Sequence, residues 1–286
     1  MKTILITGVN GYLGSKLAEK YSLYNNIVGL EKSTQNLFRL KDKKLKIYDY
    51  KSGLDDLFDN HKIDFIIHTA TIYGRNGETY SDMINSNVNF PQILLKKAID
   101  YNCKYFINTD TVLPRFTSAY SLTKNHFKDW LNFFSKNYNL KVVNLSVEHF
   151  YGPGSSETNF ITLMIRKMLK NVQNIPLTMG EQNRDFLYID DLLSVYDLVI
   201  DNLTEFSNFE NFNVGSGVNT NLRYILEFIK DYTKSNSSLD FGALKYREDE
   251  LMNSKNDINK LIALKWKPSI DIQTGLKNVI EYEKNL

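Results

Sequence analysis

The feature that most constrains how this chain folds is a glycine-rich turn at residues 8–14. A short apolar, β-branched run from Thr3 to Thr7 precedes it, and a helical pattern through Leu17 and Tyr21 follows it. Glycines three residues apart let the backbone turn sharply and approach a pyrophosphate at the amino end of a helix. A strand before the turn and a helix after it are the context that this motif requires. We therefore expect a dinucleotide site with contacts from Gly8, Asn10, Gly11, Tyr12, Leu13 and Gly14.

Strand-like and helical patterns alternate after this turn. Apolar runs that suit strands lie at residues 27–31, 46–48, 64–70, 105–108 and 141–145, and residues 54–58, 80–98 and 120–134 have helical periodicity. This alternation predicts an α/β fold with a doubly wound parallel sheet of the Rossmann type. We expect a dinucleotide-binding domain at 1–150, to which 186–220 returns, and a mainly substrate-binding domain at 151–286. His68 lies inside an apolar run and is expected to pack rather than to catalyse.

The ends of the early strands predict the remaining cofactor contacts. Glu31 ends the second strand, where a carboxylate accepts the hydroxyls of an adenosine ribose and repels a 2′-phosphate. Glu31 therefore favours NADH, although Lys32 and Arg39 are close enough in sequence to offset that repulsion and leave NADPH open. Asp49 and Tyr50 are expected near the adenine, and Thr69 and Ala70 are expected beside the cofactor at the end of the fourth strand.

Tyr120 and Lys124 are the predicted proton-transfer pair. A spacing of four residues places both on one helix face, ahead of an apolar pattern that continues to Phe134. A phenol has a pKa of about 10, and an ammonium held nearby favours the phenolate and tunes the group toward proton transfer. Thr109 ends the fifth strand, from which its hydroxyl can point into the same crevice. These three residues are the predicted catalytic set.

Composition excludes several other functions. The net charge is +2, from 35 basic and 33 acidic residues, and the lysines are scattered, so nucleic acid is not an expected partner. Cys103 is the single cysteine, and four scattered histidines offer no ligand spacing, so we expect neither a disulfide nor a metal site. The first apolar run is too short for a signal peptide and no run approaches a membrane span. We expect a cytoplasmic enzyme that does not associate with membranes.

The chain resembles the extended short-chain dehydrogenases/reductases of the NAD-dependent epimerase/dehydratase family, which modify nucleotide sugars. The matching segments are Thr7 to Gly14, Asn87-Val88, Tyr120 to Lys124, Phe150 to Gly154, Arg184 to Asp191 and Asn213 to Gly217. The resemblance implies an NAD(P)H cofactor, with Asn87, Tyr120 and Lys124 among its contacts, and a nucleotide-sugar substrate. It also implies a homodimer through a four-helix interface that includes the helix after Asn87 and the helix from Tyr120 to Phe134.

Within the family, the chain is most similar to reductases of CDP-linked 4-keto sugars. Dehydratases that resemble it have Thr-Asp-Glu after the fifth strand, where this chain has Thr109-Asp110-Thr111 and so lacks the glutamate base. The expected reaction is therefore reduction of a CDP- or dTDP-linked 4-keto-6-deoxyhexose. An epimerase that retains its NAD and a dinucleotide-sensing binding protein remain alternatives. The expected substrate contacts are Thr111, Glu148, His149, Arg184 and Arg247, with the two arginines on the diphosphate.

Overall fold

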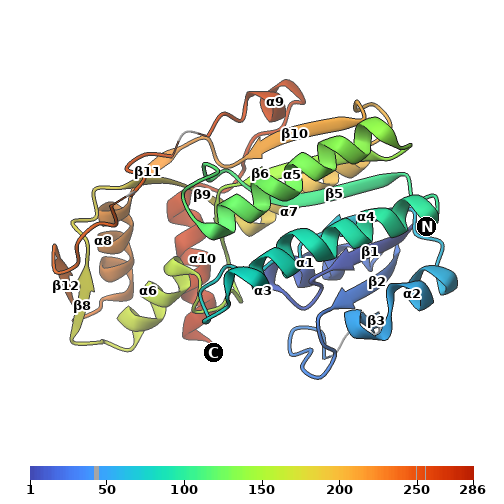
Figure 1. Cartoon of the computed structure of the whole chain (residues 1–286). Coiled ribbons are helices and arrows are strands. Elements are labelled where there is room, and N and C mark those ends of the chain that lie inside the picture. Colours follow the sequence, from blue (N-terminus) through green and yellow to red (C-terminus); the bar gives the residue numbers. More distant parts are fainter. Residues whose placement is uncertain (42–44, 249, 255) are drawn as a thin grey trace. The chain divides into compact units, whose positions relative to one another are not determined.

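The computed structural model describes residues 1–41, 45–248, 250–254 and 256–286 (Figure 1). The chain divides into two compact units. The first unit contains Met1–Ser146 and Asp197–Phe212, and the second contains Val147–Tyr196 and Asn213–Leu286. The sequence places the boundary at 150 and the returning segment at 186–220, whereas these units divide at 146/147 and only 197–212 returns.

A seven-stranded sheet with the order β10-β6-β5-β4-β1-β2-β3 forms the centre of the fold (Figure 1). The pairs β1 with β2, β1 with β4, β2 with β3 and β4 with β5 are all parallel. This order reverses direction at β1, which is the point where open α/β sheets bind ligands. The predicted Rossmann-type fold is confirmed. The strands of this sheet are β1 (Thr3–Thr7), β2 (Asn26–Glu31), β3 (Lys46–Asp49), β4 (Phe65–His68), β5 (Tyr105–Thr111), β6 (Lys141–Val147) and β10 (Phe209–Val214).

Helices cover both faces of this sheet. Alternate strand residues, such as Leu5, Ile66, Phe106 and Val142, form one apolar cluster with side chains of α2, α4 and α5. Ile4 and Ile6 alternate with Leu5 and so point to the opposite face, which α1 covers. Burial of both faces explains why these strands are nearly continuous apolar runs. The helices of this part are α1 (Tyr12–Tyr21), η1 (Tyr50–Ser52), α2 (Leu54–Asn60), α3 (Tyr80–Ile84), η2 (Asn85–Asn89), α4 (Phe90–Asp100) and α5 (Ala119–Asn137).

The helix expected over residues 80–98 is not continuous. α3 begins with a capping box in which Thr79 and Asp82 exchange hydrogen bonds, and it passes into a π-helical turn, η2. Regular α-helix resumes at α4, which has Pro91 in its first turn. The π-helical turn contains the buried Asn87, whose side chain is fully occupied with other groups of the protein. Periodicity alone gave no sign of this change in helical pitch.

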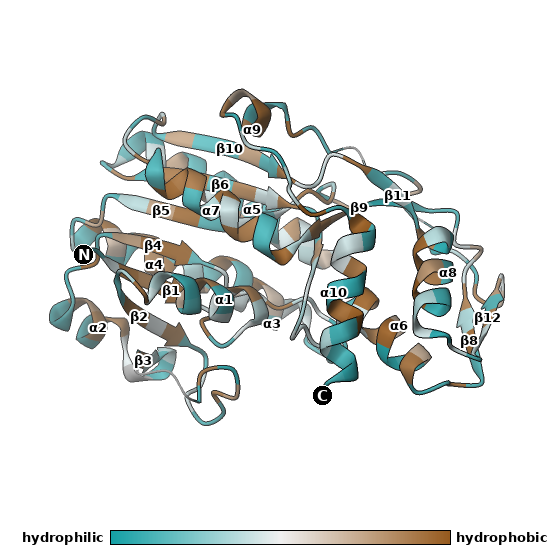
Figure 2. Cartoon of the chain, turned by 180° about the vertical axis from the view of Figure 1, so that it is seen from behind, coloured by the Kyte–Doolittle hydropathy of each residue, from teal (hydrophilic) through white to brown (hydrophobic). Residues whose placement is uncertain are grey.

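The second unit contains two small sheets and a group of amphipathic helices. β11, β9 and β7 form one sheet, with β9 antiparallel to β11 and parallel to β7, and β12 pairs with β8 in the other. Along α10, hydrophobic and hydrophilic residues alternate (Figure 2), as expected for a helix with one buried side. The elements are β7 (His149–Tyr151), α6 (Phe160–Leu169), β8 (Asn174–Leu177), β9 (Asn183–Tyr188), α7 (Ile189–Asp201), β11 (Asn219–Asn221), α8 (Leu222–Thr233), β12 (Ser238–Phe241), α9 (Asn259–Ala263) and α10 (Ile272–Lys284).

Two buried aspartates fix the loops of this second unit. Asp185 is 1% exposed and accepts hydrogen bonds from the Ser216 amide at 2.7 Å, the Ser216 hydroxyl at 2.6 Å and the Gly217 amide at 2.8 Å. Asp191 accepts from the amides of Ser269 and Ile270 at 2.8 and 3.0 Å. The Arg-Asp-Phe and Gly-Ser-Gly motifs are therefore one structural unit, held together by Asp185. In the described part of the chain, no helix is long and apolar enough to cross a membrane.

Candidate active site

The glycine turn between β1 and α1 is packed too closely for side chains. Gly8 has a φ of +66°, its amide donates to the Leu30 carbonyl at 2.9 Å, and its carbonyl accepts from the Gly11 amide at 2.9 Å. A Cβ on Gly14 would lie 2.2 Å from the Gly8 carbonyl oxygen. Gly11 precedes α1, and among the described residues no side chain makes a capping hydrogen bond at this helix start. This geometry fits a dinucleotide pyrophosphate. The other predicted contacts, Asn10, Tyr12 and Leu13, are neighbours of these glycines in the sequence.

Glu31 is tied to the same turn. Its Oε1 accepts from the Asn10 amide at 2.5 Å, and its Oε2 accepts from the Lys32 amide at 3.3 Å. Burial raises the pKa of the Glu31 carboxyl, against the lowering effect of these two hydrogen bonds. The Asn10 side chain in turn accepts from the Arg39 amide at 3.1 Å. The Glu31 carboxylate at the end of β2 is thus held beside the turn. Its remaining acceptor positions can receive hydrogen bonds from the hydroxyl groups of a ribose.

The other predicted cofactor residues have visible structural roles. Asp49 caps η1 by accepting from the Lys51 amide at 2.8 Å, and it also accepts from the Thr34 amide at 3.3 Å. Tyr50 packs edge-on against Phe90. The hydroxyl of Thr69 donates to the Thr7 carbonyl at 2.8 Å, and the Ala70 amide donates to the Thr7 hydroxyl at 3.4 Å. These contacts fix the strand ends where the adenosine and nicotinamide portions are expected.

Asn87 connects the segment after β4 to α5. Its side-chain oxygen accepts from the Thr71 hydroxyl and the Ile72 amide, both at 3.0 Å. Its amide nitrogen donates to the Ile72 carbonyl at 2.9 Å and to the Thr123 hydroxyl at 3.0 Å. All four hydrogen-bonding positions of the side chain are therefore used within the protein. The direct role visible for Asn87 is to position residues 71–72 against the helix that carries Tyr120 and Lys124.

The predicted catalytic residues lie together where β5 meets α5. A reciprocal cap between Ser118 and Ser121 begins α5, and Tyr120 and Lys124 follow one turn apart in it. The Lys124 ammonium is 2% exposed and donates to the Thr109 backbone carbonyl at 2.7 Å. Lys124 thus holds the end of β5 against α5, which places Thr109 and Tyr120 on neighbouring elements.

The electrostatic setting of Tyr120 differs from the expectation. Burial raises the pKa of the Tyr120 phenol well above its ordinary value, Tyr73 and Asp110 add to the rise, and Arg75 opposes it. The Lys124 ammonium is directed to the Thr109 carbonyl, so the expected lowering of the Tyr120 pKa by Lys124 is not seen in this structure. Tyr120 is therefore a protonated phenol at neutral pH, the form that can donate a proton to an oxygen.

Tyr73 is a neighbour of Tyr120 that sequence reasoning missed. The two rings lie 4.8 Å apart between centroids with 35° between their planes, and the Arg75 guanidinium lies 5.2 Å from the Tyr73 ring. Tyr73 is 46% exposed and lies in the segment that Asn87 anchors. Nothing in the sequence around residue 73 resembles a motif, so no signal was available there.

Thr111, the residue in place of the dehydratase glutamate, has no ionisable side chain. Its hydroxyl accepts from the Leu113 amide at 3.2 Å, and its amide donates to Asp110 at 2.8 Å. The neighbouring Asp110 is 4% exposed and accepts from the Asn144 side chain at 2.9 Å. This end of β5 consequently carries a hydroxyl, a buried carboxylate and a second hydroxyl in succession.

In the second unit, the predicted substrate arginines differ in their surroundings. Arg184 donates to Glu250 at 2.5 Å and to the Asn183 carbonyl at 3.1 Å, so its guanidinium is oriented by a carboxylate that the sequence did not indicate. Arg247 is exposed, and its carbonyl accepts from the Glu250 amide at 3.1 Å. A single short segment therefore carries Arg247 and orients Arg184.

Glu148 and His149 are adjacent residues with opposite exposure. Glu148 is buried and accepts from the Ser254 hydroxyl at 3.4 Å, whereas His149 is about half exposed. The His149 Nδ1 lies 3.4 Å from the same Glu148 carboxylate. Of the two predicted substrate contacts, His149 is therefore the more accessible.

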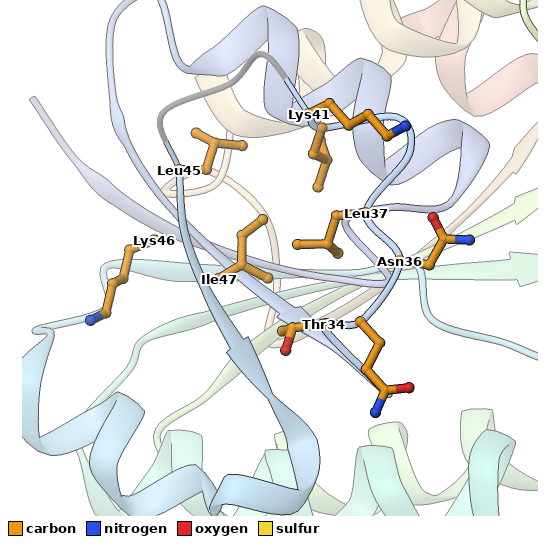
Figure 3. Close-up of a pocket in the computed structure, with 9 residues that line it drawn as sticks. Thr34, Asn36, Leu37, Lys41, Leu45, Lys46 and Ile47 are labelled. Atoms are coloured by element: carbon orange, nitrogen blue, oxygen red, sulfur yellow. The ribbon is translucent and has the colours of Figure 1, made fainter.

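A hollow lies beside the predicted cofactor residues, because the Thr34 amide donates to Asp49 and the Asn36 carbonyl accepts from the Asn10 side chain. Residues 34–37, 40–41 and 45–47 line this hollow. Leu37 and Ile47 point toward its centre, as Figure 3 shows, and Leu40 and Lys46 also line it. In the described stretches of the chain, no group of three His, Cys, Asp or Glu side chains is arranged to hold a metal ion.

Known proteins match this chain over most of its length. The profile of the NAD dependent epimerase/dehydratase family matches residues 4–215. CDP-abequose synthase of Salmonella typhimurium is 28% identical over 97% of this chain and 97% of its own length. A putative UDP-glucose 4-epimerase of Methanocaldococcus jannaschii is 26% identical over 99% of this chain and 98% of its own.

Solved structures share the fold. A UDP-glucose 4-epimerase of Thermotoga maritima with UDP-glucose has a TM-score of 0.87 at 22% identity, covering 99% of both chains. A UDP-glucuronic acid 4-epimerase of Bacillus cereus with UDP-glucuronic acid and NAD has the same TM-score and coverage at 23% identity. With the family profile over most of the chain, the glycine turn and the tyrosine–lysine helix, the chain belongs to the NAD-dependent epimerase/dehydratase family and is an NAD(P)-dependent enzyme.

Proposed function

We propose that this enzyme reduces a nucleotide-linked 4-keto-6-deoxyhexose, CDP- or dTDP-linked and possibly also deoxygenated at C3, in deoxysugar synthesis for a surface polysaccharide. The observation that carries the proposal is the group at the β5–α5 junction. It contains a hydroxyl at Thr109, a protonated phenol at Tyr120 and the Lys124 ammonium, with a threonine at position 111. The likeness to CDP-abequose synthases over nearly the full chain supports this substrate class.

Each catalytic residue has a role in this reaction. A bound nicotinamide dinucleotide supplies the hydride, which adds to C4 of the sugar. Tyr120 donates its phenolic proton to the carbonyl oxygen, so that hydride and proton together convert the ketone to a hydroxyl. Thr109 donates a hydrogen bond to the same oxygen and stabilises the charge that develops there. Lys124 stabilises the phenolate that Tyr120 becomes and holds a ribose hydroxyl of the cofactor.

The arginines of the second unit suit the diphosphate of the substrate. A guanidinium donates two parallel hydrogen bonds, which matches the oxygens of a phosphate. Glu250 orients Arg184 through the contact at 2.5 Å, and Arg247 is exposed three residues before Glu250. Because the diphosphate is unchanged in the reaction, these contacts bind substrate and transition state alike and act mainly on the Michaelis constant. His149 is proposed as a contact to the sugar.

Thr111 argues against dehydration as the reaction. Removal of a proton from carbon C5 requires a base, and the side chain at 111 is a hydroxyl that accepts from the Leu113 amide. A nucleotide-linked glucose without a carbonyl should therefore remain unchanged when it is mixed with the enzyme.

The epimerase alternative is supported by the fold neighbours, several of which are sugar-nucleotide 4-epimerases. An epimerase returns the hydride that it removes and consumes no cofactor. A panel of CDP-, dTDP- and GDP-linked 4-keto-6-deoxy sugars, each with added reduced cofactor, separates the two readings. We expect cofactor oxidation with at least one CDP- or dTDP-linked ketone. Interconversion of two sugars by protein that already holds NAD, with no oxidation on the panel, would replace reduction by epimerisation.

We further propose that NADH is preferred to NADPH and that the protein is a cytoplasmic homodimer. The Glu31 carboxylate beside the glycine turn supports the cofactor preference, because a 2′-phosphate there would meet like charge. Ile93 on α4 and Phe133 on α5 are 45% and 50% exposed, which supports an interface through these two helices. A dinucleotide-sensing protein without catalysis is disfavoured by the intact set of Thr109, Tyr120 and Lys124.

A further inference from the structure

A row of buried polar side chains crosses the face of the central sheet that α5 covers. Thr7, His68 and Asn108 are in register on the adjacent strands β1, β4 and β5. Each lies two residues after an apolar cluster member on its strand, so all three point to the α5 side. The Thr7 hydroxyl lies 2.7 Å from the His68 Nδ1, and Asn108 donates to the Asn144 side chain on β6 at 2.6 Å. Buried polar side chains are costly unless they are hydrogen-bonded, so a row of them across four apolar strands calls for a structural or functional explanation.

Asp110 ends this row and carries the charge in it. It lies two residues after Asn108, on the same side of β5. Its carboxylate accepts from the Asn144 side chain at 2.9 Å and from the Thr111 amide at 2.8 Å. Asn144 is itself held by Asn211 on β10 at 2.7 Å. Residues of β5, β6 and β10 therefore hold the side chain of Asp110, which is 4% exposed.

The buried ammonium of Lys124 needs such a group. An ammonium taken out of water is costly unless an opposite charge compensates it. The hydrogen bond of Lys124 to the Thr109 carbonyl is a bond to a neutral acceptor. Burial lowers the pKa of Lys124 and raises the pKa of Asp110, and in each case the charge of the other group opposes the effect of burial.

We propose that Asp110 is a positioning residue, held by Asn144, that keeps Lys124 in its ammonium form one helical turn from Tyr120. The inference rests on the proposed function for its catalytic consequence. It assigns Asp110 an action through Lys124, without contact to the substrate. The reduction needs a charged Lys124, because the phenolate that Tyr120 becomes is stabilised by an adjacent cation.

The other ionisable groups near this pair do not replace Asp110. His68 on β4 is neutral, because burial and then the nearby Lys124 charge hold its pKa well below the ordinary value. Lys128 on α5 adds a positive charge near Asp110. Tyr120 has its pKa raised and carries no charge at neutral pH, and Arg75 brings a further positive charge to its side. Asp110 is therefore the negative group among these neighbours.

The test measures the protonation of Lys124 directly in cofactor-free protein. Protein with ¹³C-labelled lysine is titrated by NMR, and the Lys124 Cε signal is assigned with Lys124→Arg. Asp110→Asn should lower the Lys124 pKa by about one unit or more, since an opposite charge is lost. Asp129→Asn is the matched control, because Asp129 is an exposed aspartate of α5 that pairs with Arg115. It should leave the Lys124 titration unchanged.

Activity provides the second measurement. Removing the Asp110 charge lowers the Lys124 pKa, so the ammonium is lost at a lower pH. The alkaline limb of kcat/KM for ketone reduction should move to lower pH in Asp110→Asn and stay in place in Asp129→Asn. A wild-type enzyme that oxidises no reduced cofactor with any ketone refutes the proposed function. That outcome does not change the NMR result, which tests only the effect of Asp110 on the Lys124 titration and needs no substrate.

An unchanged Lys124 titration in folded Asp110→Asn would overturn the proposal. If that variant does not fold, Asp110→Ser, which keeps an acceptor for Asn144, takes its place. The wild-type protein also gives an answer without any substitution at position 110. The Asp110 Cγ and Lys124 Cε signals should each show a step where the other group titrates, and independent titrations would contradict the proposed coupling.

Discussion

Gly11 and Gly14 belong to the same turn but should respond differently to an added methyl group. A Cβ on Gly14 would lie 2.2 Å from the Gly8 carbonyl oxygen and 3.0 Å from the Thr69 hydroxyl. Carbon and oxygen approach to about 3.3 Å in favourable contacts, so the turn and α1 must separate by about 1 Å. Forcing atoms into a packed region lowers the free energy of unfolding by up to ~3 kcal/mol. Alanine has a higher helix propensity than glycine, which offsets ~1 kcal/mol of that loss. Gly14→Ala should therefore lose about 2 kcal/mol of stability.

Gly11→Ala is the comparison variant. Its Cβ would lie 3.0 Å from the Gly8 oxygen, and its φ of −66° is ordinary for alanine. We expect a stability loss under ~1 kcal/mol. The methyl group would nevertheless stand where the pyrophosphate must approach, so reduced-cofactor affinity should fall by at least about tenfold.

Urea unfolding followed by circular dichroism gives the first quantity, and fluorescence titration with reduced nicotinamide gives the second. Gly14→Ala as stable as the wild type would refute the packing argument. Unchanged cofactor affinity in Gly11→Ala would refute the placement of the pyrophosphate at this turn.

Three further predictions concern catalysis, cofactor choice and assembly. Tyr120→Phe should lower turnover by about 10²–10⁴-fold while cofactor affinity stays near normal, measured by steady-state kinetics and binding; near-normal turnover would remove Tyr120 from proton transfer. The wild type should have a higher kcat/KM with NADH than with NADPH, and Glu31→Ala should narrow the difference; NADPH preferred by both proteins would show that Glu31 does not set the choice. Phe133→Glu should convert a dimer to a monomer in sedimentation at micromolar concentration, and a monomeric wild type would contradict the interface.

Much of the first unit follows from the sequence for a clear physical reason. Both faces of the central sheet are buried, so strands such as Thr3–Thr7 and Phe65–His68 are continuous apolar runs, and the turn at Gly8 needs glycine. Periodicity did not indicate the π-helical turn at Asn85–Asn89, where the Asn87 side chain is hydrogen-bonded to Ile72 and Thr123, residues that only the folded chain brings near.

The candidate site was predicted unevenly for a similar reason. Tyr120 and Lys124 could be paired because four residues on one helix fix their relation. Tyr73 and Glu250 could not be found, because only the folded chain brings them to Tyr120 and Arg184. Asn108 and Asn144 did carry a signal, since each is an amide inside an apolar strand. Such amides indicate a buried polar network.

The fate of the hydride tests the central proposal most directly. The purified enzyme would be incubated with a 4-keto-6-deoxyhexose linked to CDP or dTDP and with reduced nicotinamide carrying deuterium at the transferred position. Mass spectrometry and NMR would then locate the label. The account predicts one deuterium at C4 of the product for each cofactor oxidised. Unlabelled product, formed with no net oxidation by protein that retains NAD, would contradict it.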